Sequence, residues 1–144
     1  MYQRSLVCFV KINTMTIRRV SFIYIKDRKL LVALNEGKKR WYTPGGRVEP
    51  DETDEAALCR ELAEELGIII APVSLQLYKA FKGMADEKTE DKLEVISFLG
   101  HLDAVPLPHN EIVKLDYFTS SDKHHLSPVA QNLFTALYDD GLVD

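Results

Sequence analysis

The chain has 144 residues, a length typical of a single domain, and its 46% hydrophobic and 28% charged residues exclude a disordered or collagen-like protein. Its 18 basic and 22 acidic residues give a net charge of −4, which argues against a general nucleic-acid binder, because such proteins carry excess positive charge. The sequence has no apolar run long enough for a membrane span, and its two cysteines are too few for a disulfide scaffold. We therefore expect a cytoplasmic protein with reduced thiols and no nucleic-acid or membrane partner.

The beginning of the chain differs from the rest. The apolar run Leu6–Val10 is too short for a signal-peptide core, and Met15 resembles a second possible start. We expect residues 1–15 to be an N-terminal extension, either upstream of the true start or forming an extra strand over 6–12, and residues 16–144 to form one domain. An extra strand of this kind could pair with a second copy of the chain in a homodimer.

Short strand-like segments surround one long helical pattern in residues 16–144. β-Branched and aromatic composition, interrupted by turn residues, predicts strands over 18–25, 30–34, 40–43, 68–70, 74–81, 93–102 and 113–119. Residues 85–92 are polar and read as a loop. Helical spacing predicts a helix over 53–66 that ends at Gly67. Ser127 and Pro128 are typical of a helix start and predict a second helix to about Asp139. This order indicates an α/β or α+β fold with a mixed sheet and two main helices.

Three carboxylates share one edge of the first predicted helix. At about 100° per residue, Glu64 and Glu65 lie about 60° and about 40° to either side of Glu61. Such like charges repel one another, and the helix dipole disfavours them near the C-terminus. A divalent cation would remove both penalties, and carboxylate oxygens suit Mg²⁺ or Mn²⁺. A solvated acidic surface is the alternative. The predicted apolar face beside this edge consists of Leu58, Cys59, Leu62, Ala63 and Leu66.

The residues around this helix favour the metal site. From Gly46 the chain reads Gly, five residues, Glu52, seven residues, Arg60-Glu61-Leu62, one residue, Glu64-Glu65, one residue, Gly67-Ile68. This pattern resembles the Nudix box, GX5EX7REUXEEXGU with U an aliphatic residue, at every defined position. A chance match of seven fixed residues at one start has a probability on the order of 10⁻⁹. The motif covers 23 of 144 residues, and the resemblance implies a Nudix-type α/β/α sandwich with a mixed sheet.

The resemblance also implies an activity and a set of site residues. Nudix hydrolases cleave a nucleoside diphosphate linked to another group, using Mg²⁺ or Mn²⁺ and water. By resemblance the carbonyl of Gly45 would face the metal, and Arg60 and Glu52 would form an ion pair that orients the loop and the helix. A divalent ion neutralises phosphate charge and acidifies the attacking water, and a carboxylate removes the proton. The metal-binding carboxylates of the box would be Glu61, Glu64 and Glu65.

Further candidate residues lie outside the box. Glu111 precedes the last predicted strand, as does the extra metal-binding or base glutamate of members that act on nucleoside triphosphates; a solvated loop charge is the alternative, and Glu94 is a weaker candidate. Arg47 is a candidate phosphate contact or a surface charge. Trp41 and Tyr42 could stack on a base, or could simply pack in the core.

The substrate is predicted by elimination. Signatures of members acting on ADP-ribose, dinucleoside polyphosphates or coenzyme A are absent after the box, so a nucleoside triphosphate, oxidised forms included, is favoured. Its cleavage would give a nucleotide and pyrophosphate. The alternatives are hydrolysis of ADP-ribose, nucleotide sugars or dinucleoside polyphosphates, and a Nudix-fold ligand sensor without catalysis. An intact box favours the enzyme over the sensor.

Overall fold

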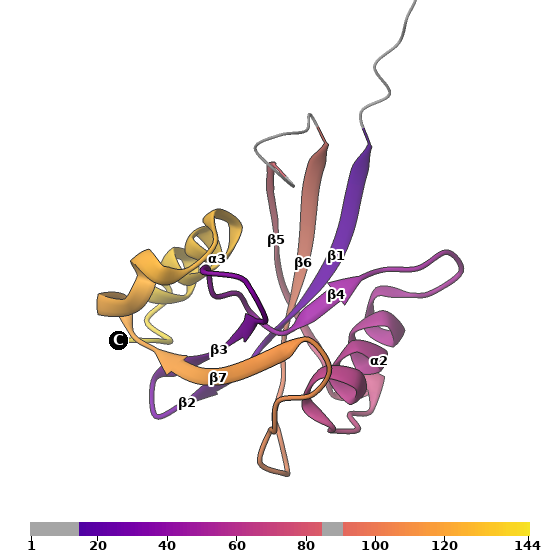
Figure 1. The fold of residues 1–144 in the computed structure, drawn as a ribbon, viewed down its shortest axis with the longest axis horizontal. Helices are drawn as coiled ribbons and strands as arrows, with labels where there is room; N and C mark the ends of the chain where they lie inside the picture. The colour runs from indigo at the N-terminus through magenta and orange to yellow at the C-terminus, as the bar shows by residue number, and fades with distance from the viewer. Residues whose placement is uncertain (1–14, 85–90) are drawn as a thin grey trace, which may run out of the picture.

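The strands form two sheets in the computed structural model, which describes residues 15–84 and 91–144 (Figure 1). The larger sheet has the order β4-β1-β6-β5, in which β1 pairs parallel with β6 and the other pairs are antiparallel. The smaller, antiparallel sheet has the order β2-β3-β7. The strands are β1 (Thr16–Ile23), β2 (Ile25–Lys26), β3 (Lys29–Asn35), β4 (Gly45–Arg47), β5 (Gln76–Met84), β6 (Lys92–Leu99) and β7 (Ile112–Phe118).

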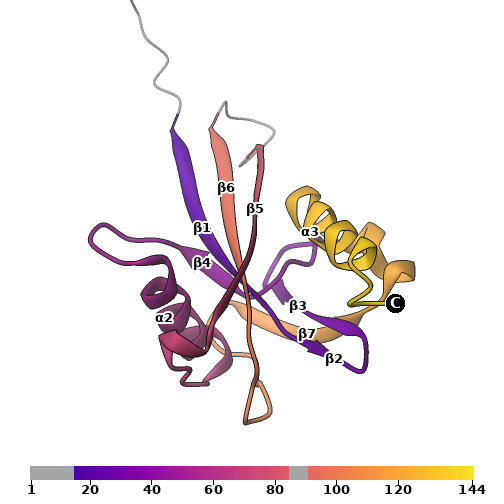
Figure 2. The same ribbon diagram turned by 180° about the vertical axis from the view of Figure 1, so that it is seen from behind.

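Two α-helices lie on opposite sides of the larger sheet (Figures 1 and 2). Helix α2 (Asp54–Leu66) packs against β1 and β4, and helix α3 (Pro128–Asp139) packs against β5. Two short 3₁₀ helices, η1 (Pro72–Ser74) and η2 (Ser120–His125), complete the described structure. The expected α/β/α sandwich with a mixed sheet is confirmed, although the strands divide between two sheets.

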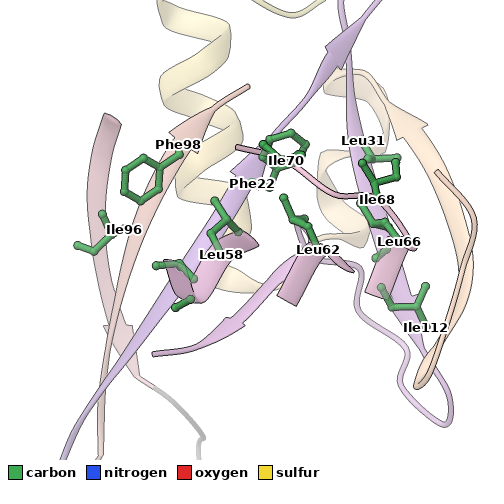
Figure 3. Packing of buried hydrophobic residues seen from close by; sticks show 13 residues of the cluster. Phe22, Leu31, Leu58, Leu62, Leu66, Ile68, Ile70, Ile96, Phe98 and Ile112 are labelled. Atoms are coloured by element: carbon green, nitrogen blue, oxygen red, sulfur yellow. The ribbon is translucent and has the colours of Figure 1, made fainter. Parts of the chain in front are cut away.

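The alternation of side chains along β1 assigns each of its faces to one helix. On one face Phe22 packs with Leu58, Leu62 and Leu66 of α2 in the first core cluster (Figure 3). On the other face Ile23 belongs to a second core cluster, which α3 supplies with residues such as Leu133, Phe134 and Leu137. The second half of β1 therefore carries buried apolar side chains on both faces, whereas Arg18 and Arg19 lie in its first, less buried half.

The helix boundaries agree closely with the sequence prediction because their signals are local. The Thr53 hydroxyl accepts a hydrogen bond from the amide of Ala56 at 3.1 Å, and Gly67 adopts the left-handed conformation with φ of 67°. Helix α3 begins at Pro128 and ends at Asp139. No helix within 15–84 or 91–144 is long and apolar enough to cross a membrane.

Two predicted strands do not form. Residues 40–43 make only isolated bridges, from Tyr42 to Ala33 and from Trp41 to Leu126; the amide-less Pro44 follows them and cannot continue such a ladder. Residues 68–70 pair with no described strand; the apolar run instead places Ile68 and Ile70 in the first core cluster. The predicted strand over 6–12 and most of the predicted loop over 85–92 lie outside the described residues.

Candidate active site

The buried face of helix α2 differs in part from the apolar face that the sequence predicts. Its buried residues are Ala57, Leu58, Leu62, Glu65 and Leu66, whereas Ala63 is exposed and Cys59 is half-buried. Ala57 lies about 40° on the other side of Glu61 from Glu65, so the buried sector extends across the acidic edge. The predicted apolar face is therefore wrong at Ala63, and one carboxylate of the edge lies inside the protein.

Glu65 is the buried carboxylate, with only 3% of its surface exposed. Its Oε2 atom accepts a hydrogen bond of 3.1 Å from the amide of Gly45 in β4. The pKa of Glu65 is raised to about 8: burial is the main cause and the negative charges of Glu61 and Glu111 add to it, while the Gly45 amide and the charge of Arg19 oppose it. A buried carboxylate with one backbone donor is a costly group unless a cation compensates its charge.

Arg60 forms hydrogen bonds with several parts of the Nudix box. Its guanidinium donates two hydrogen bonds of 2.8 Å to Glu52, one of 3.0 Å to Oε1 of Glu61 and one of 3.1 Å to the carbonyl of Arg47. The guanidinium of Arg60 lowers the pKa of Glu52 to about 2, so the pair stays ionised at neutral pH. The predicted Arg60–Glu52 ion pair is present, and it connects the loop before α2 to the acidic edge.

Glu61 and Glu64 are less enclosed than Glu65. Burial raises the pKa of Glu61, and Arg60 opposes this rise. The Glu64 side chain is 49% exposed, and its Oε1 atom lies 3.6 Å from a guanidinium nitrogen of Arg60. The three predicted metal-binding carboxylates thus share one edge of α2 but have different environments.

Two glycines allow β4 to approach this edge. A Cβ atom at Gly45, where φ is 153°, would lie 2.0 Å from the carbonyl oxygen of Val20 in β1. A Cβ atom at Gly46 would lie 2.2 Å from the carboxyl carbon of Glu61. Only glycine leaves space for the β1 backbone at the first position and for the acidic side chain at the second.

Glu111 is brought towards the same edge by the loop before β7. The amide of His109 donates to the carbonyl of Glu65 at 2.9 Å, and the carbonyl of Glu111 accepts from the amide of Glu36 at 2.8 Å. These backbone bonds hold the loop against the end of α2, and the negative charge of Glu111 contributes to the raised pKa of Glu65. Glu94 instead pairs with Arg18 at 2.5 Å, on the face of β1 that bears α2.

Two adjoining cavities open on the face of β1 that is turned away from α2. A cavity of about 280 Å³ is lined by Ile17, Arg19, Asn35, Tyr42, Arg47 and Leu93. A narrower cavity of about 90 Å³ continues beside it, with Arg19, Tyr42 and Leu93 in common. Its remaining lining includes Val95 of β6 and Val129, Ala130 and Leu133 of α3.

Arg47, a candidate phosphate contact from the sequence, lines the larger cavity. Arg19 and Asn35 line it too, but they were not among the residues that the sequence indicated. Arg19 faces Arg47 across the antiparallel β1–β4 pair, and Asn35 accepts a hydrogen bond of 2.6 Å from the Tyr42 hydroxyl. The alternation of β1 could have placed Arg19 on the face opposite Arg18. The pairing of β1 with β4 has no comparable signal in the sequence.

Trp41 lies outside both cavities. Its ring packs 5.2 Å from that of Phe118 in the second core cluster, and its backbone bonds to His125 and Ser127. Neighbouring residues of an extended segment point to opposite sides, so Tyr42 lines the cavities when Trp41 packs inward. Of the two aromatic residues considered for base stacking, Tyr42 is therefore the one that lines the cavities.

The acidic edge has the donors that a hard divalent cation prefers. Within residues 15–84 and 91–144, no three acidic, histidine or cysteine side chains are close enough together to hold an ion as they lie, because Glu61 and Glu65 are turned to Arg60 and to Gly45. The nature of the donors nevertheless fits Mg²⁺ or Mn²⁺, which bind carboxylate oxygens. A cation there would also compensate the buried charge of Glu65.

Comparisons with known proteins agree with this architecture. The family model described as NUDIX domain matches residues 15–134. The 8-oxo-dGDP phosphatase NUDT18 of Mus musculus is 35% identical over 76 residues, which is 50% of this chain and 21% of that protein. The CTP pyrophosphohydrolase of Escherichia coli (strain K12) is 45% identical over 53 residues, 34% of this chain and 39% of that protein. These alignments thus span less than half the length of either curated relative.

Solved structures share the fold over nearly the whole chain. The E. coli ORF135 protein superposes with a TM-score of 0.69 and 25% identity, covering 91% of this chain and 96% of that one. The MutT protein from Methanosarcina mazei Go1 gives a TM-score of 0.74 at 20% identity, covering 91% and 99%; at this identity the likeness concerns the fold alone. The family match over most of the chain, together with the complete box on α2, shows that this chain belongs to the NUDIX domain family.

Proposed function

We propose that this chain is a metal-dependent hydrolase that cleaves a phosphoric anhydride bond of a nucleoside triphosphate, oxidised forms included, and releases a nucleotide and pyrophosphate. The observation that carries the proposal is the proximity of two unlike regions, the acidic edge of α2 and the arginine-lined cavities: Gly45 lines the narrower cavity and its amide donates to Glu65. Arg19 lies between them, because it lines both cavities and its charge lowers the pKa values of Glu61 and Glu65. A nucleoside could enter the cavities while its phosphates extend to the acidic edge.

Some of the relatives are named for nucleoside triphosphates, such as the CTP pyrophosphohydrolase, whereas NUDT18 is named for the diphosphate 8-oxo-dGDP. The putative 8-oxo-dGTP diphosphatase 2 of Mycobacterium tuberculosis (strain ATCC 25618 / H37Rv) is 56% identical over 36 residues, 25% of this chain. The alignment spans only a quarter of this chain and 26% of that protein. The preference for a triphosphate over other nucleoside diphosphate derivatives is therefore part of the proposal.

In this proposal Mg²⁺ or Mn²⁺ is held by the box carboxylates and the carbonyl of Gly45, with Glu111 as a further ligand or as the base. A bound divalent ion would neutralise phosphate charge and lower the pKa of water. Arg60, fixed by Glu52, orients Glu61 on α2, and the Gly45 amide orients Glu65. The box carboxylates that would bind the ion are Glu61, Glu64 and Glu65.

A hydrolysis screen tests the proposed function. Purified protein is incubated with Mg²⁺ or Mn²⁺ and with common and oxidised nucleoside triphosphates, ADP-ribose, nucleotide sugars and dinucleoside polyphosphates, with Glu65→Gln as the blank. We expect turnover of nucleoside triphosphates that the blank lacks. Selective turnover of another class would overturn the substrate, and binding of metal and nucleotide without any turnover would support a ligand sensor instead.

The role of Glu111 has its own test. Glu111→Gln removes a negative charge that lies close to Glu65, and loss of a metal ligand or base should lower kcat by about 10²-fold or more. Glu36→Gln is the matched control, because Glu36 is an exposed neighbour whose backbone amide, not its side chain, contacts Glu111. If both variants retain kcat within a few-fold of the parent chain, Glu111 is a solvated loop charge.

A further inference from the structure

We propose that Arg19 and Arg47 together form a clamp for the phosphate attached directly to the nucleoside, strong enough to bind a nucleoside 5′-monophosphate without a divalent metal. This inference rests on the proposed function for the identity of the ligand. It assigns a role to Arg19, and it separates two phosphate sites: one formed by guanidinium groups and one on the acidic edge of α2.

The placement of the two arginines is the first argument. Arg19 and Arg47 are directly opposite residues of the antiparallel β1–β4 pair, where side chains share one face and like charges destabilise the sheet. Among the described residues neither guanidinium has a carboxylate within ion-pair distance, unlike the adjacent Arg18, which pairs with Asp54 and Glu94. Two unpaired guanidinium groups held side by side gain most from a shared anion.

The chemistry of the cavity is the second argument. Among residues 15–84 and 91–144, the lining of the 280 Å³ cavity contains both arginines and no acidic residue. The Tyr42 hydroxyl donates to Oδ1 of Asn35, so the amide nitrogen of Asn35 keeps two donor hydrogens for another acceptor. Guanidinium groups bind phosphate in a bidentate manner. A cavity whose described lining is rich in donors and free of carboxylates is therefore suited to a phosphate group.

The position of the clamp between two regions identifies the phosphate. On one side the narrower cavity continues past Arg19 to apolar residues of β6 and α3, which suit a base rather than a charged group. On the other side Glu61 and Glu65 are near enough for the charge of Arg19 to lower their pKa values. With the base in the cavity and the outer phosphates at the acidic edge, the phosphate at the arginines is the one attached to the nucleoside.

The test uses binding without turnover. Isothermal titration calorimetry in EDTA measures the binding of the four common nucleoside 5′-monophosphates, each compared with its nucleoside, to the parent chain, Arg19→Gln, Arg47→Gln and the control Arg18→Gln. We expect at least one monophosphate to bind the parent chain about tenfold or more tightly than its nucleoside. This ratio should collapse in Arg19→Gln and Arg47→Gln, persist in Arg18→Gln, and weaken with added salt.

A second readout separates a clamp from a structural role. Because the opposed arginines repel each other, Arg19→Gln should not lower the Tm of the free protein, whereas a structural contact would. Equal affinity for monophosphate and nucleoside in the parent chain, or a ratio that survives both substitutions, overturns the clamp. A monophosphate preference in a chain that hydrolyses nothing supports the clamp while refuting the proposed function, so the two failures are distinguishable.

Discussion

Glu65→Gln should lower the hydrolysis rate by several orders of magnitude while the chain still folds. Glutamine has nearly the same shape and can still accept the hydrogen bond from the Gly45 amide, but it lacks the negative charge that a divalent ion needs. The measurement is kcat with Mg²⁺ and with Mn²⁺ on the best substrate of the screen. A rate within tenfold of the parent chain would refute the assignment of Glu65 as a metal ligand.

The stability of Glu65→Gln in EDTA is the control for folding. Here the substitution should be favourable at high pH, in contrast to its effect on the hydrolysis rate. The folded chain keeps the Glu65 proton up to a pKa of about 8, whereas an unfolded glutamate loses it near the ordinary pKa of 4.5. Between these values the folded state binds more protons, so the free energy of unfolding falls as pH rises. Glutamine does not titrate, so without metal the variant should be more stable than the parent chain above pH 8 and similar to it at pH 4. Denaturant titrations at both pH values check this; a less stable variant at high pH would contradict it.

Alanine at the two neighbouring glycines should have effects that differ in kind. At Gly45 the new Cβ would lie 2.0 Å from a backbone oxygen of Val20, which cannot move without breaking the β1–β4 pair, so folding should be severely impaired. At Gly46 the conflict is with the carboxylate of Glu61, the mobile end of a side chain. Gly46→Ala should therefore fold with little loss of Tm, while kcat falls by about 10²-fold because Glu61, a proposed metal ligand, is displaced.

Gly37→Ala provides the control for both. Gly37 has a φ of 75°, and a Cβ atom added there would meet nothing within 4 Å, so its substitution has the cost of the backbone conformation alone, about 1 kcal/mol. The measurements are the Tm and kcat of Gly45→Ala, Gly46→Ala and Gly37→Ala, each compared with the parent chain. Full activity in Gly46→Ala would show that Glu61 works from another position, and a normal Tm in Gly45→Ala would contradict the close approach of β4 to β1.

The parts of the fold that could be predicted from the sequence depend on neighbours along the chain. Thr53 and Gly67 bound α2 through contacts within four residues, and the Arg60–Glu52 pair, expected from the resemblance to the Nudix box, joins residues eight positions apart. The acidic edge itself also follows from helical periodicity. All these features depend on short separations in sequence, where geometry is nearly fixed once the helix is given.

The remaining features depend on pairing between distant segments. The burial of Glu65 was not predictable from the leucine pattern, because it depends on how β4 and the β7 loop meet α2. Arg19 and Arg47 are neighbours only through the register of β1 against β4. Tyr42 faces the cavity because the neighbouring Trp41 packs to the opposite side, against Phe118, which is 77 positions further along the chain. Long-range register of this kind has no local signal in one sequence.

The inner wall of the narrower cavity is also part of the protein core. Val20 belongs to the first core cluster and Leu133 to the second, yet both line the cavity. Creating space at a buried leucine such as Leu133 costs about 2–5 kcal/mol, a large share of the stability of a small domain. Asn35 and Arg47, at the outer end, are not part of either cluster. Under the proposed function, a change of substrate preference therefore costs far less stability through substitutions at Asn35 or Arg47 than through substitutions at Leu133.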